Sequence, residues 1–325
     1  MTALAAPAPP ELRRPAVPWA RMIWVTWRQH RGALAAVLAL LGGIGVFLLV
    51  TRISMRASYA SLGLNNCRSV TSPQCAIQVS DFAGRYTWVG TFSLFLGAAP
   101  MLIGAFTGGP LLAREFESGT SRFAWSQGCG RLRWTLAKLV LVGVAVTVTA
   151  LAFSQLYAWW YQPFVATDGR LESTAFEITN MVFAARALLG FAIGAFAGTL
   201  IRRTVPAVAA AMAGWLAIVL LARLYLRPRY QAPLVMSWSI GGEPGVQPRG
   251  WYLGQYVTGP GGHRISDATV AHLSSAQLQG GYRWVQLYQP ESRFWHFQAI
   301  EGGWMLALAV LLGAATIWLV RRSAA

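Results

Sequence analysis

Two carboxylates two residues apart, Glu115 and Glu117, stand in the densest polar stretch of the sequence, from Ala113 to Trp134. Paired carboxylates can act as general acid and general base when they face one another. On a helix, residues two apart do not share a face. The spacing therefore argues against a catalytic pair at this position.

The other residue types that support catalysis lack the required patterns. The histidines of the C-terminal third, which are His263, His272 and His296, do not have the spacing of metal ligands. The sequence has no GxxxxGK[ST] loop that would bind ATP, and its apolar runs carry no nucleophile with an adjacent base. We predict no catalytic residue, no metal site and no cofactor in this chain.

Long apolar runs dominate the chain, in which 55% of the 325 residues are hydrophobic and 12% are charged. So few charges cannot cover a water-soluble globule of this size, and the mean hydropathy of +0.45 predicts lipid as the solvent. A bilayer core about 30 Å thick needs about 20 apolar residues per helix. We predict an all-α polytopic membrane protein with six transmembrane helices, at residues 33–51, 88–112, 136–160, 176–201, 204–226 and 303–320.

The basic residues predict how the six spans are oriented across the membrane. The chain carries 27 Lys and Arg residues and a net charge of +16. One side of the six-span arrangement holds Arg13, Arg14, Arg21, Arg28, Arg31, Arg114, Arg122, Arg131, Arg133, Lys138, Arg202, Arg203, Arg321 and Arg322. The two short loops opposite hold Arg52, Arg56, Arg68, Arg85 and Arg170. Because cytoplasmic loops are enriched in Lys and Arg, both termini are predicted to be cytoplasmic in a plasma membrane, and the basicity requires no nucleic-acid partner.

The domain organisation follows from these spans. Residues 1–17, rich in Ala and Pro, are predicted to be a disordered cytoplasmic tail. Residues 18–320 form one transmembrane domain, which includes a cytoplasmic loop at 113–135 and an extracellular segment at 227–302. Residues 321–325 form a second short cytoplasmic tail.

The extracellular segment is too long for a simple connection, so we expect a small ordered cap before the last transmembrane helix. Its clearest helical stretch runs from Asp267 to Leu278. The alternative is that its many aromatic residues simply lie at the membrane interface.

The segment from Trp19 to Arg31 repeats apolar and aromatic residues at helical spacing, with arginines off that stripe. This pattern predicts a helix along the inner membrane surface, with Trp at the headgroups and Arg facing anionic lipid. The alternative is an N-terminal extension of the first transmembrane helix. The residues that would mark the interfacial helix are Trp19, Arg21, Trp24, Trp27 and Arg28.

Cys67 and Cys75 share the first outer loop, whereas Cys129 lies in the inner loop. The two outer cysteines are close enough in sequence to form a disulfide in an oxidising exterior. The alternative, two free thiols, stays open because sequence does not show that the side chains meet.

Two spans carry small residues on one helical face. Glycines repeat every fourth position at Gly104 and Gly108 and again at Gly190, Gly194 and Gly198. Because glycine lets helix backbones approach closely, we predict that these faces are helix packing surfaces.

Arg186 is the intramembrane charge of most interest. Arginines inside a membrane often mark a transport pathway or a partner, which makes Arg186 a possible pathway residue. If its helix begins late, Arg186 instead lies near the outer surface, where its side chain reaches the headgroups, and this is the interpretation we favour. Arg223, near the outer end of the fifth span, is expected to reach the headgroups as well.

Several motifs now combine into a resemblance. The pattern ARE-x-E-x-GT from Ala113 to Thr120, followed by R-x-RW-x-x-AK from Arg131 to Lys138, resembles the signature of ABC transporter permeases of the type-2 (exporter) class. The actinobacterial branch of this class is indicated by WRQHRGAL (Trp27 to Leu34), RRTVPA (Arg202 to Ala207) and RFWHFQAIEGG (Arg293 to Gly303). The resemblance covers nearly the whole chain. Cys129 departs from it, because Pro or a β-branched residue is expected there.

The resemblance implies a transport subunit that is not itself an enzyme. Such permeases pair two six-helix halves, identical or homologous, and bind two separate ATPase subunits that hold ATP and Mg. The path between the halves would carry a hydrophobic or amphiphilic substrate out of the cell. The residues implied in ATPase coupling are Arg114, Glu115, Glu117, Gly119, Thr120, Arg131 and Arg133, with the segment from Trp19 to Arg31 beside them.

Two alternative interpretations, which assign the chain to other functional classes, remain open. The chain could be a membrane-anchored scaffold or sensor that acts through its extracellular segment, or a membrane-anchored enzyme with its chemistry in that segment. The charged inner loop could likewise be a solvated loop held in the cytoplasm by its arginines. That account does not explain Glu115 and Glu117.

Overall fold

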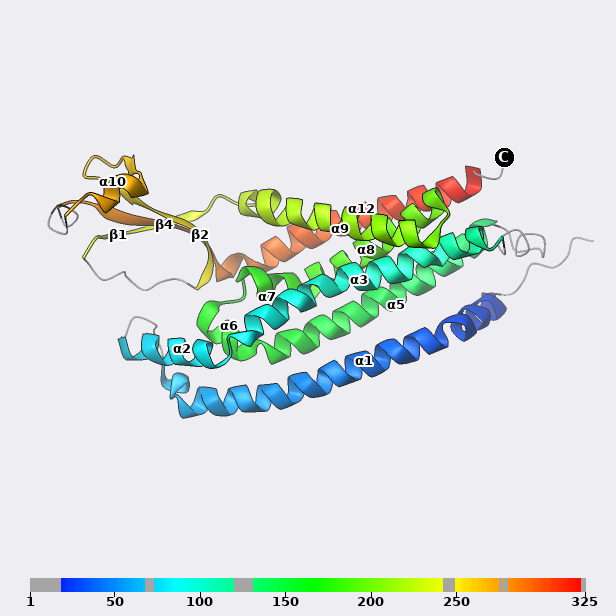
Figure 1. Cartoon of the computed structure of the whole chain (residues 1–325), viewed down its shortest axis with the longest axis horizontal. Helices are drawn as coiled ribbons and strands as arrows, with labels where there is room; N and C mark the ends of the chain where they lie inside the picture. Colours follow the sequence, from blue (N-terminus) through cyan, green and yellow to red (C-terminus); the bar gives the residue numbers. More distant parts are fainter. Residues whose placement is uncertain are drawn as a thin grey trace, which may run out of the picture.

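Long helices packed side by side form most of the molecule, and a small β-sheet lies at one end of the bundle (Figure 1). The computed structural model describes residues 19–67, 73–119, 131–241, 249–274, 277 and 280–322. The long helices are α1 (Trp19–Ser61), α3 (Trp88–Glu117), α5 (Arg131–Trp160), α8 (Asn180–Ile201), α9 (Thr204–Leu221) and α12 (Phe294–Arg322). The predicted tail at 1–17, Thr120 and residues 323–325 lie outside the described residues.

Five helices in the described part of the chain are long and apolar enough to cross a membrane, judged by length and composition. They cover Trp88–Glu117, Arg131–Trp160, Asn180–Ile201, Thr204–Arg229 and Glu291–Arg322. Each contains or overlaps one of the second to sixth predicted spans, so the chain folds as a helical multi-pass membrane protein. The first predicted span lies within α1, and a crossing there stays a prediction.

Two helices extend beyond the apolar runs that predicted them. α3 continues to Glu117, into the predicted cytoplasmic loop, and α12 begins at Phe294, inside the predicted extracellular segment. Hydropathy marks only the part of a helix that lies in lipid. The backbone hydrogen bonds of a helix continue through polar residues, so its ends fall outside that part.

The fourth predicted span is not one helix. A short helix, α7 (Ser173–Ile178), ends at Thr179, whose backbone is extended, and α8 then begins at Asn180. Asn180 has φ of 56°, a left-handed conformation that Asn adopts more readily than most residues. The apolar run therefore bends near its N-terminal end, which hydropathy alone does not reveal.

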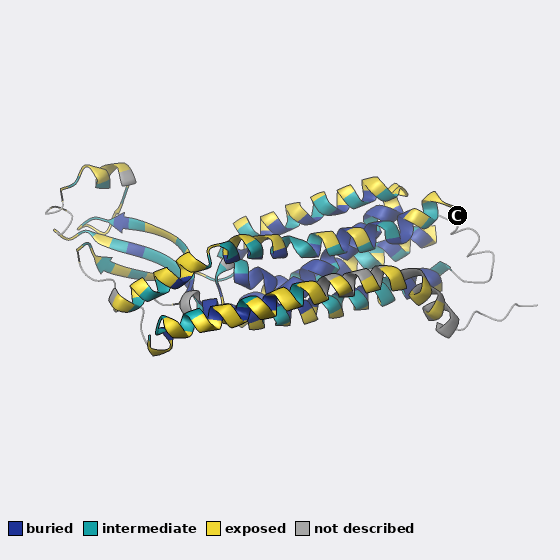
Figure 2. Ribbon diagram, turned by 60° about the horizontal axis from the view of Figure 1, so that its bottom comes forward, coloured by how far each residue is buried: buried dark blue, intermediate teal, exposed yellow. Residues whose placement is uncertain are grey.

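α8 is the central helix of the bundle, since 83% of its apolar window is buried, against 22 to 33% in the other candidate spans. Those helices bury one side and expose the other, as Figure 2 shows by their alternating yellow and blue faces. Large apolar side chains such as Phe95, Val148 and Val310 are exposed on the outside. An exposed surface of this kind is suited to lipid.

The glycines of α3 and α8 lie where these two helices cross. A Cβ atom added to Gly104 would lie 2.5 Å from the carbonyl carbon of Gly190. A Cβ atom added to Gly194 would lie 2.6 Å from the backbone nitrogen of Gly109. The remaining three glycines of the pattern, Gly108, Gly190 and Gly198, also face the backbone of the partner helix. Side chains larger than hydrogen would force the helices apart.

α1 is one unbroken helix of 43 residues that includes the predicted interfacial segment. Its first turns, dark blue in Figure 1, are set at an angle to the rest of the helix. The side chains of Trp24, Trp27 and Arg28 are exposed, and the Arg28 guanidinium lies 5.4 Å from the ring centre of Trp24. The helix therefore continues without a break into the first predicted span, as the alternative interpretation described. A position of residues 19–31 along the membrane surface stays a prediction.

The segment before the last helix folds as a four-stranded antiparallel sheet, at the end of the molecule opposite the C-terminus (Figure 1). The strands are β1 (Leu234–Ser239), β2 (Gly250–Thr258), β3 (Arg264–Ile265) and β4 (Arg283–Pro290), in the order β1-β4-β2-β3. Cross-strand pairs such as Trp238 with Trp284 place aromatic side chains side by side. The expected helix from Asp267 is short, because α10 ends at Ala271.

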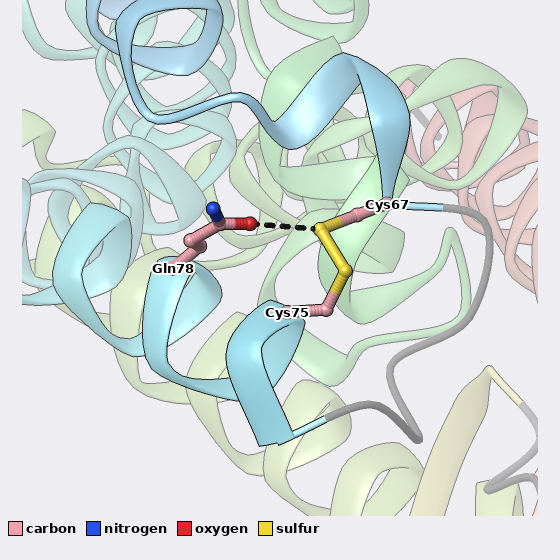
Figure 3. Close-up of a disulfide and its surroundings, with 3 residues drawn as sticks. All are labelled: Cys67, Cys75 and Gln78. Atoms are coloured by element: carbon pink, nitrogen blue, oxygen red, sulfur yellow. Dashed lines mark hydrogen bonds between the residues drawn. A yellow bond between two sulfur atoms is a disulfide. The ribbon is translucent and has the colours of Figure 1, made fainter.

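Short helices lie at the same end of the bundle as the sheet. They are α2 (Pro73–Arg85) and α6 (Gln162–Asp168), together with α7 (Figure 1). A disulfide between Cys67 and Cys75 joins the chain after α1 to the first turn of α2, and the Gln78 side-chain amide lies 3.1 Å from the Cys67 sulfur (Figure 3). The cross-link fixes the C-terminal end of α1 to the α2 helix.

Candidate functional site

The end of α3 is joined to the start of α9 through Glu117. One carboxylate oxygen of Glu117 accepts hydrogen bonds from the Thr204 backbone N–H at 3.0 Å and from the Thr204 hydroxyl at 2.8 Å. Thr204 is the first residue of α9, where backbone N–H groups have no partner within the helix. A carboxylate at this position is also favoured by the helix dipole.

Glu115 turns to a different helix. It forms an ion pair with Lys138 of α5, whose ammonium also lies 4.5 Å from the ring centre of Trp134. The Lys138 side chain is 9% exposed and that of Glu115 is 23% exposed, so the pair is largely shielded from water. The two carboxylates, two residues apart, thus tie α3 to α5 and to α9, and neither faces the other.

The remaining predicted coupling residues surround these links. Arg114 and Arg133 are exposed, Arg131 is half-buried, and Gly119 has a positive φ of 72° just after α3 ends. Arg202 and Arg203 at the α8–α9 turn are exposed as well, and the Arg202 guanidinium lies 5.9 Å from the Phe116 ring centre. This end of the bundle therefore presents positive charge outward, while its two carboxylates are held by Lys138 and Thr204.

A second group of charges is buried at the other end of the bundle, the end that carries the sheet. Arg186 of α8 donates to Glu301 of α12 at 2.9 Å, and Arg227 donates to both oxygens of Glu301 at 2.8 Å. Glu177 of α7 accepts from Arg227 at 2.9 Å and lies 3.2 Å from Arg186. Arg186 and Glu301 are 0% exposed and Arg227 is 1% exposed. Two arginines and two glutamates thus neutralise one another out of contact with solvent.

The favoured interpretation of Arg186 is wrong. Its side chain does not reach the headgroups, because it points into the bundle and pairs with Glu301 and Glu177. The helix does begin late, at Asn180, as that interpretation required. The partners that meet Arg186 come from α7 and α12, however, and they hold its charge inside. Arg223 is 37% exposed and lies 3.7 Å from Glu177, at the edge of the same group.

Glu177, Arg227 and Glu301 are charges that the sequence interpretation did not connect with Arg186. Glu301 is 115 residues away from Arg186 and was assigned to the outer segment. A signal did exist, because Glu177 and Glu301 lie at the ends of apolar runs, as Arg223 and Arg227 do. Ionisable residues in such segments usually pair with one another.

Gln298 closes the break between α7 and α8. Its amide nitrogen donates to the carbonyl oxygens of Phe176 and Thr179 at 3.1 and 3.2 Å, and its amide oxygen accepts from the Val182 N–H at 2.9 Å. These are backbone groups that the interrupted helix leaves without partners. Gln298 therefore fixes α7, α8 and α12 relative to one another, directly beside the buried charges.

The charges act on the ionisation of Glu177, which lies in α7, outside the helices that could span a membrane. Burial opposes ionisation of this carboxyl, but the Arg186 and Arg227 guanidinium groups outweigh burial and lower the pKa of Glu177 to about 2. Glu177 is therefore a carboxylate at neutral pH.

Among the described residues, no group of three or more His, Cys, Asp or Glu side chains could hold a metal ion.

Fold and sites together define a helical multi-pass membrane protein with charged contacts at both ends of its bundle. The chain matches the family model of ABC-2 membrane transporter related proteins over residues 35–227, more than half of its length, and it belongs to that family. The resemblance inferred from the motifs is thus confirmed for the class, while the actinobacterial branch stays a prediction. No curated protein and no solved structure matches the chain.

The match contains the helices α3, α5, α8 and α9 with both carboxylate links, and it ends at Arg227. The sheet and α12, which supplies Glu301, follow the matched region. Membership of a membrane transporter family agrees with the expectation of a transport subunit.

Proposed function

We propose that this chain is the membrane-spanning permease subunit of an ATP-driven exporter in the plasma membrane. It works with two copies of a separate ATPase subunit, which bind ATP and Mg, and with a second permease half, identical or homologous. Its substrate is hydrophobic or amphiphilic. Family membership supports the permease role, and the missing phosphate-binding loop supports a separate ATPase chain.

The observation that carries the coupling role is the pair of links from the end of α3. Glu115 joins this end to Lys138 of α5, and Glu117 joins it to Thr204 of α9. A force on the loop after Glu117 is therefore transmitted to two neighbouring helices by charged contacts. The exposed arginines around the links, such as Arg114 and Arg133, provide positive charge for a partner protein.

The disulfide supports the proposed orientation. Disulfides persist in oxidising surroundings outside the cytosol, and Cys67 and Cys75 lie at the end of the bundle that carries the sheet. The arginine-rich end, with Arg202 and Arg203, then faces the cytoplasm in agreement with the charge rule.

The test is affinity purification of the tagged chain from its native host in mild detergent, followed by mass spectrometry. The proposal expects an ABC ATPase in stoichiometric amount with the wild-type chain. Arg114→Glu with Arg133→Glu should reduce its recovery, whereas the matched variant Arg264→Glu in β3 should not.

A folded chain that recovers no ATPase, under detergent conditions in which other membrane complexes survive, would contradict the proposal. In that case a scaffold or sensor that acts through the sheet becomes the better account, and a partner of residues 234–290 should be sought.

A further inference from the structure

Glu177 is contacted by two arginines that lie one helical turn apart. The same carboxylate oxygen, Oε1, lies 2.9 Å from Arg227 Nη1 and 3.7 Å from Arg223 Nε. Arg227 is 1% exposed, whereas the Arg223 side chain is 37% exposed. One arginine thus holds the carboxylate from inside the bundle, and the other approaches it from the surface.

The segment that carries the two arginines has irregular helical geometry. α9 ends at Leu221, residues Ala222–Leu226 form a π-helix, and Arg227–Arg229 form a 3₁₀-helix. Such short π and 3₁₀ stretches are frequent at functional hinges. The chain then passes directly into β1, so a change in this segment would move the sheet.

The other side of the charge group is held firmly. Gln298 bonds to backbone atoms on both sides of the α7–α8 break, which fixes Glu177 against α8 and α12. Glu301 also accepts a hydrogen bond from Arg186 at 2.9 Å, a contact in which Arg227 takes no part. Glu177 is therefore a fixed point, and the segment from Ala222 to Arg229 is the part able to move.

The fixed side also contains an unused donor. The Nε atom of Arg186 is buried and makes no hydrogen bond within the described residues, while Nη1 of the same guanidinium lies 3.2 Å from the Glu177 carboxylate. Buried donors of this kind are rare in proteins and call for an explanation. If Arg227 withdrew, the Nε–H group of Arg186 would be available for a carboxylate oxygen that Arg227 had held, and Arg223 could approach Glu177 from outside.

We propose that Glu177 is a handover point between Arg227 and Arg223, which lets the end of α9 and the attached sheet move while the two buried carboxylates keep two arginine partners. In the state observed here, Arg227 holds Glu177 and Glu301 together. In the second state Arg227 leaves the group, Arg223 pairs with Glu177, and Arg186 keeps Glu301. Leaving a buried charge unpaired is strongly unfavourable, and an exchange of one arginine for another avoids that cost. The device operates within this chain and needs no ATPase partner for its test.

The first measurement is a double-mutant cycle on thermal unfolding of the purified protein, in which unfolding is monitored by tryptophan fluorescence. Arg223→Gln should lower the melting temperature slightly in the wild type but strongly in the Arg227→Gln background, where Arg223 has replaced Arg227 as the second arginine beside Glu177. In a Glu177→Gln background, Arg223→Gln should have no further effect. Equal shifts from Arg223→Gln in the wild-type and Arg227→Gln backgrounds would overturn the proposal.

The second measurement follows the movement itself. Spin labels at Val235 in β1 and Val148 in α5, both exposed, are introduced in a Cys129→Ser background and their separation is measured by pulsed electron resonance. Arg227→Gln should shift the distance distribution, while Arg264→Gln, which removes one charge from the same end, should not. An unchanged distribution in Arg227→Gln would overturn the handover. If Arg227→Gln does not yield folded protein, Arg227→Lys replaces it, and the same two comparisons decide.

Discussion

Glu117, the last residue of α3, accepts both hydrogen bonds offered by Thr204, the first residue of α9, across a separation of 87 residues. The contact joins the C-terminal end of α3 to a helix whose exposed side chains are mostly apolar. Its position at a helix N-terminus means that the carboxylate satisfies N–H groups that would otherwise need water.

Removal of this contact should weaken coupling more than folding. Glu117→Ala should insert normally, because the residue is exposed, yet export per ATP hydrolysed should fall several-fold as the loop loses its link to α9. The measurement is ATPase activity and transport in vesicles that contain the complete complex. Thr204→Ser keeps both donors and should retain transport, while Thr204→Val loses the hydroxyl and should be intermediate. Full coupling in Glu117→Ala would show that the link carries no force.

The buried charges should behave in the opposite manner, as a condition of folding. Glu301→Gln leaves Arg227 and Arg186 with one remaining carboxylate, and removal of one member of a buried ion pair costs about 3–5 kcal/mol. The free energy of unfolding in detergent, from chemical denaturation, should fall by about that amount. Combining Glu301→Gln with Arg186→Gln restores charge balance and should recover part of the loss.

The matched control for this experiment is the ion pair between Arg170 and Glu291, 3.5 Å apart and with the Arg170 side chain 57% exposed. Arg170→Gln should change the free energy of unfolding by less than about 1 kcal/mol, because exposed pairs contribute little. Similar losses in Arg170→Gln and Glu301→Gln would contradict the assignment of the buried group as a stabilising centre.

The crossing of α3 and α8 should not accommodate even one added methyl group. Gly194→Ala would place its Cβ 2.6 Å from the backbone of Gly109, and overpacking of this kind costs about 1–3 kcal/mol. Gly313→Ala in α12 is the control, since no atom lies within 4 Å of its added Cβ. Thermal unfolding should show a lower melting temperature for Gly194→Ala and an unchanged or slightly higher one for Gly313→Ala. The idea fails if both substitutions are tolerated equally.

The sequence predicted the parts of this fold that depend on the solvent. A bilayer demands about 20 apolar residues per crossing, so the second to sixth spans were visible as runs of that length. Small residues at intervals of four likewise indicated where α3 and α8 meet. These features depend on local composition, and no knowledge of the partner segment is required to recognise them.

The parts that were not predicted depend on contacts between distant segments. The sheet pairs β1 with β4 across about fifty residues, and its strands contain Gly and Pro among the aromatic residues, which obscures the alternation. The pairing of Arg186 with Glu177 depends on the break between α7 and α8, and its pairing with Glu301 joins residues 115 positions apart. The partners of Glu115 and Glu117 could not be predicted either, because their spacing shows only that the two side chains lie on different faces of a helix.

The disulfide offers a test of both stability and orientation. Cys67 and Cys75 are eight residues apart, and a loop of this size should stabilise the protein by about 2–3 kcal/mol through restriction of the unfolded chain. Cys67→Ser with Cys75→Ser should therefore lower the melting temperature, and reductant should lower that of the wild type but not that of the double variant. In intact cells treated with a membrane-impermeant reductant, an impermeant maleimide should label Cys67 and Cys75, whereas Cys129 should react only after lysis. Labelling of Cys129 in intact cells, without labelling of the other two, would reverse the proposed orientation, because the arginine-rich end would then face outward.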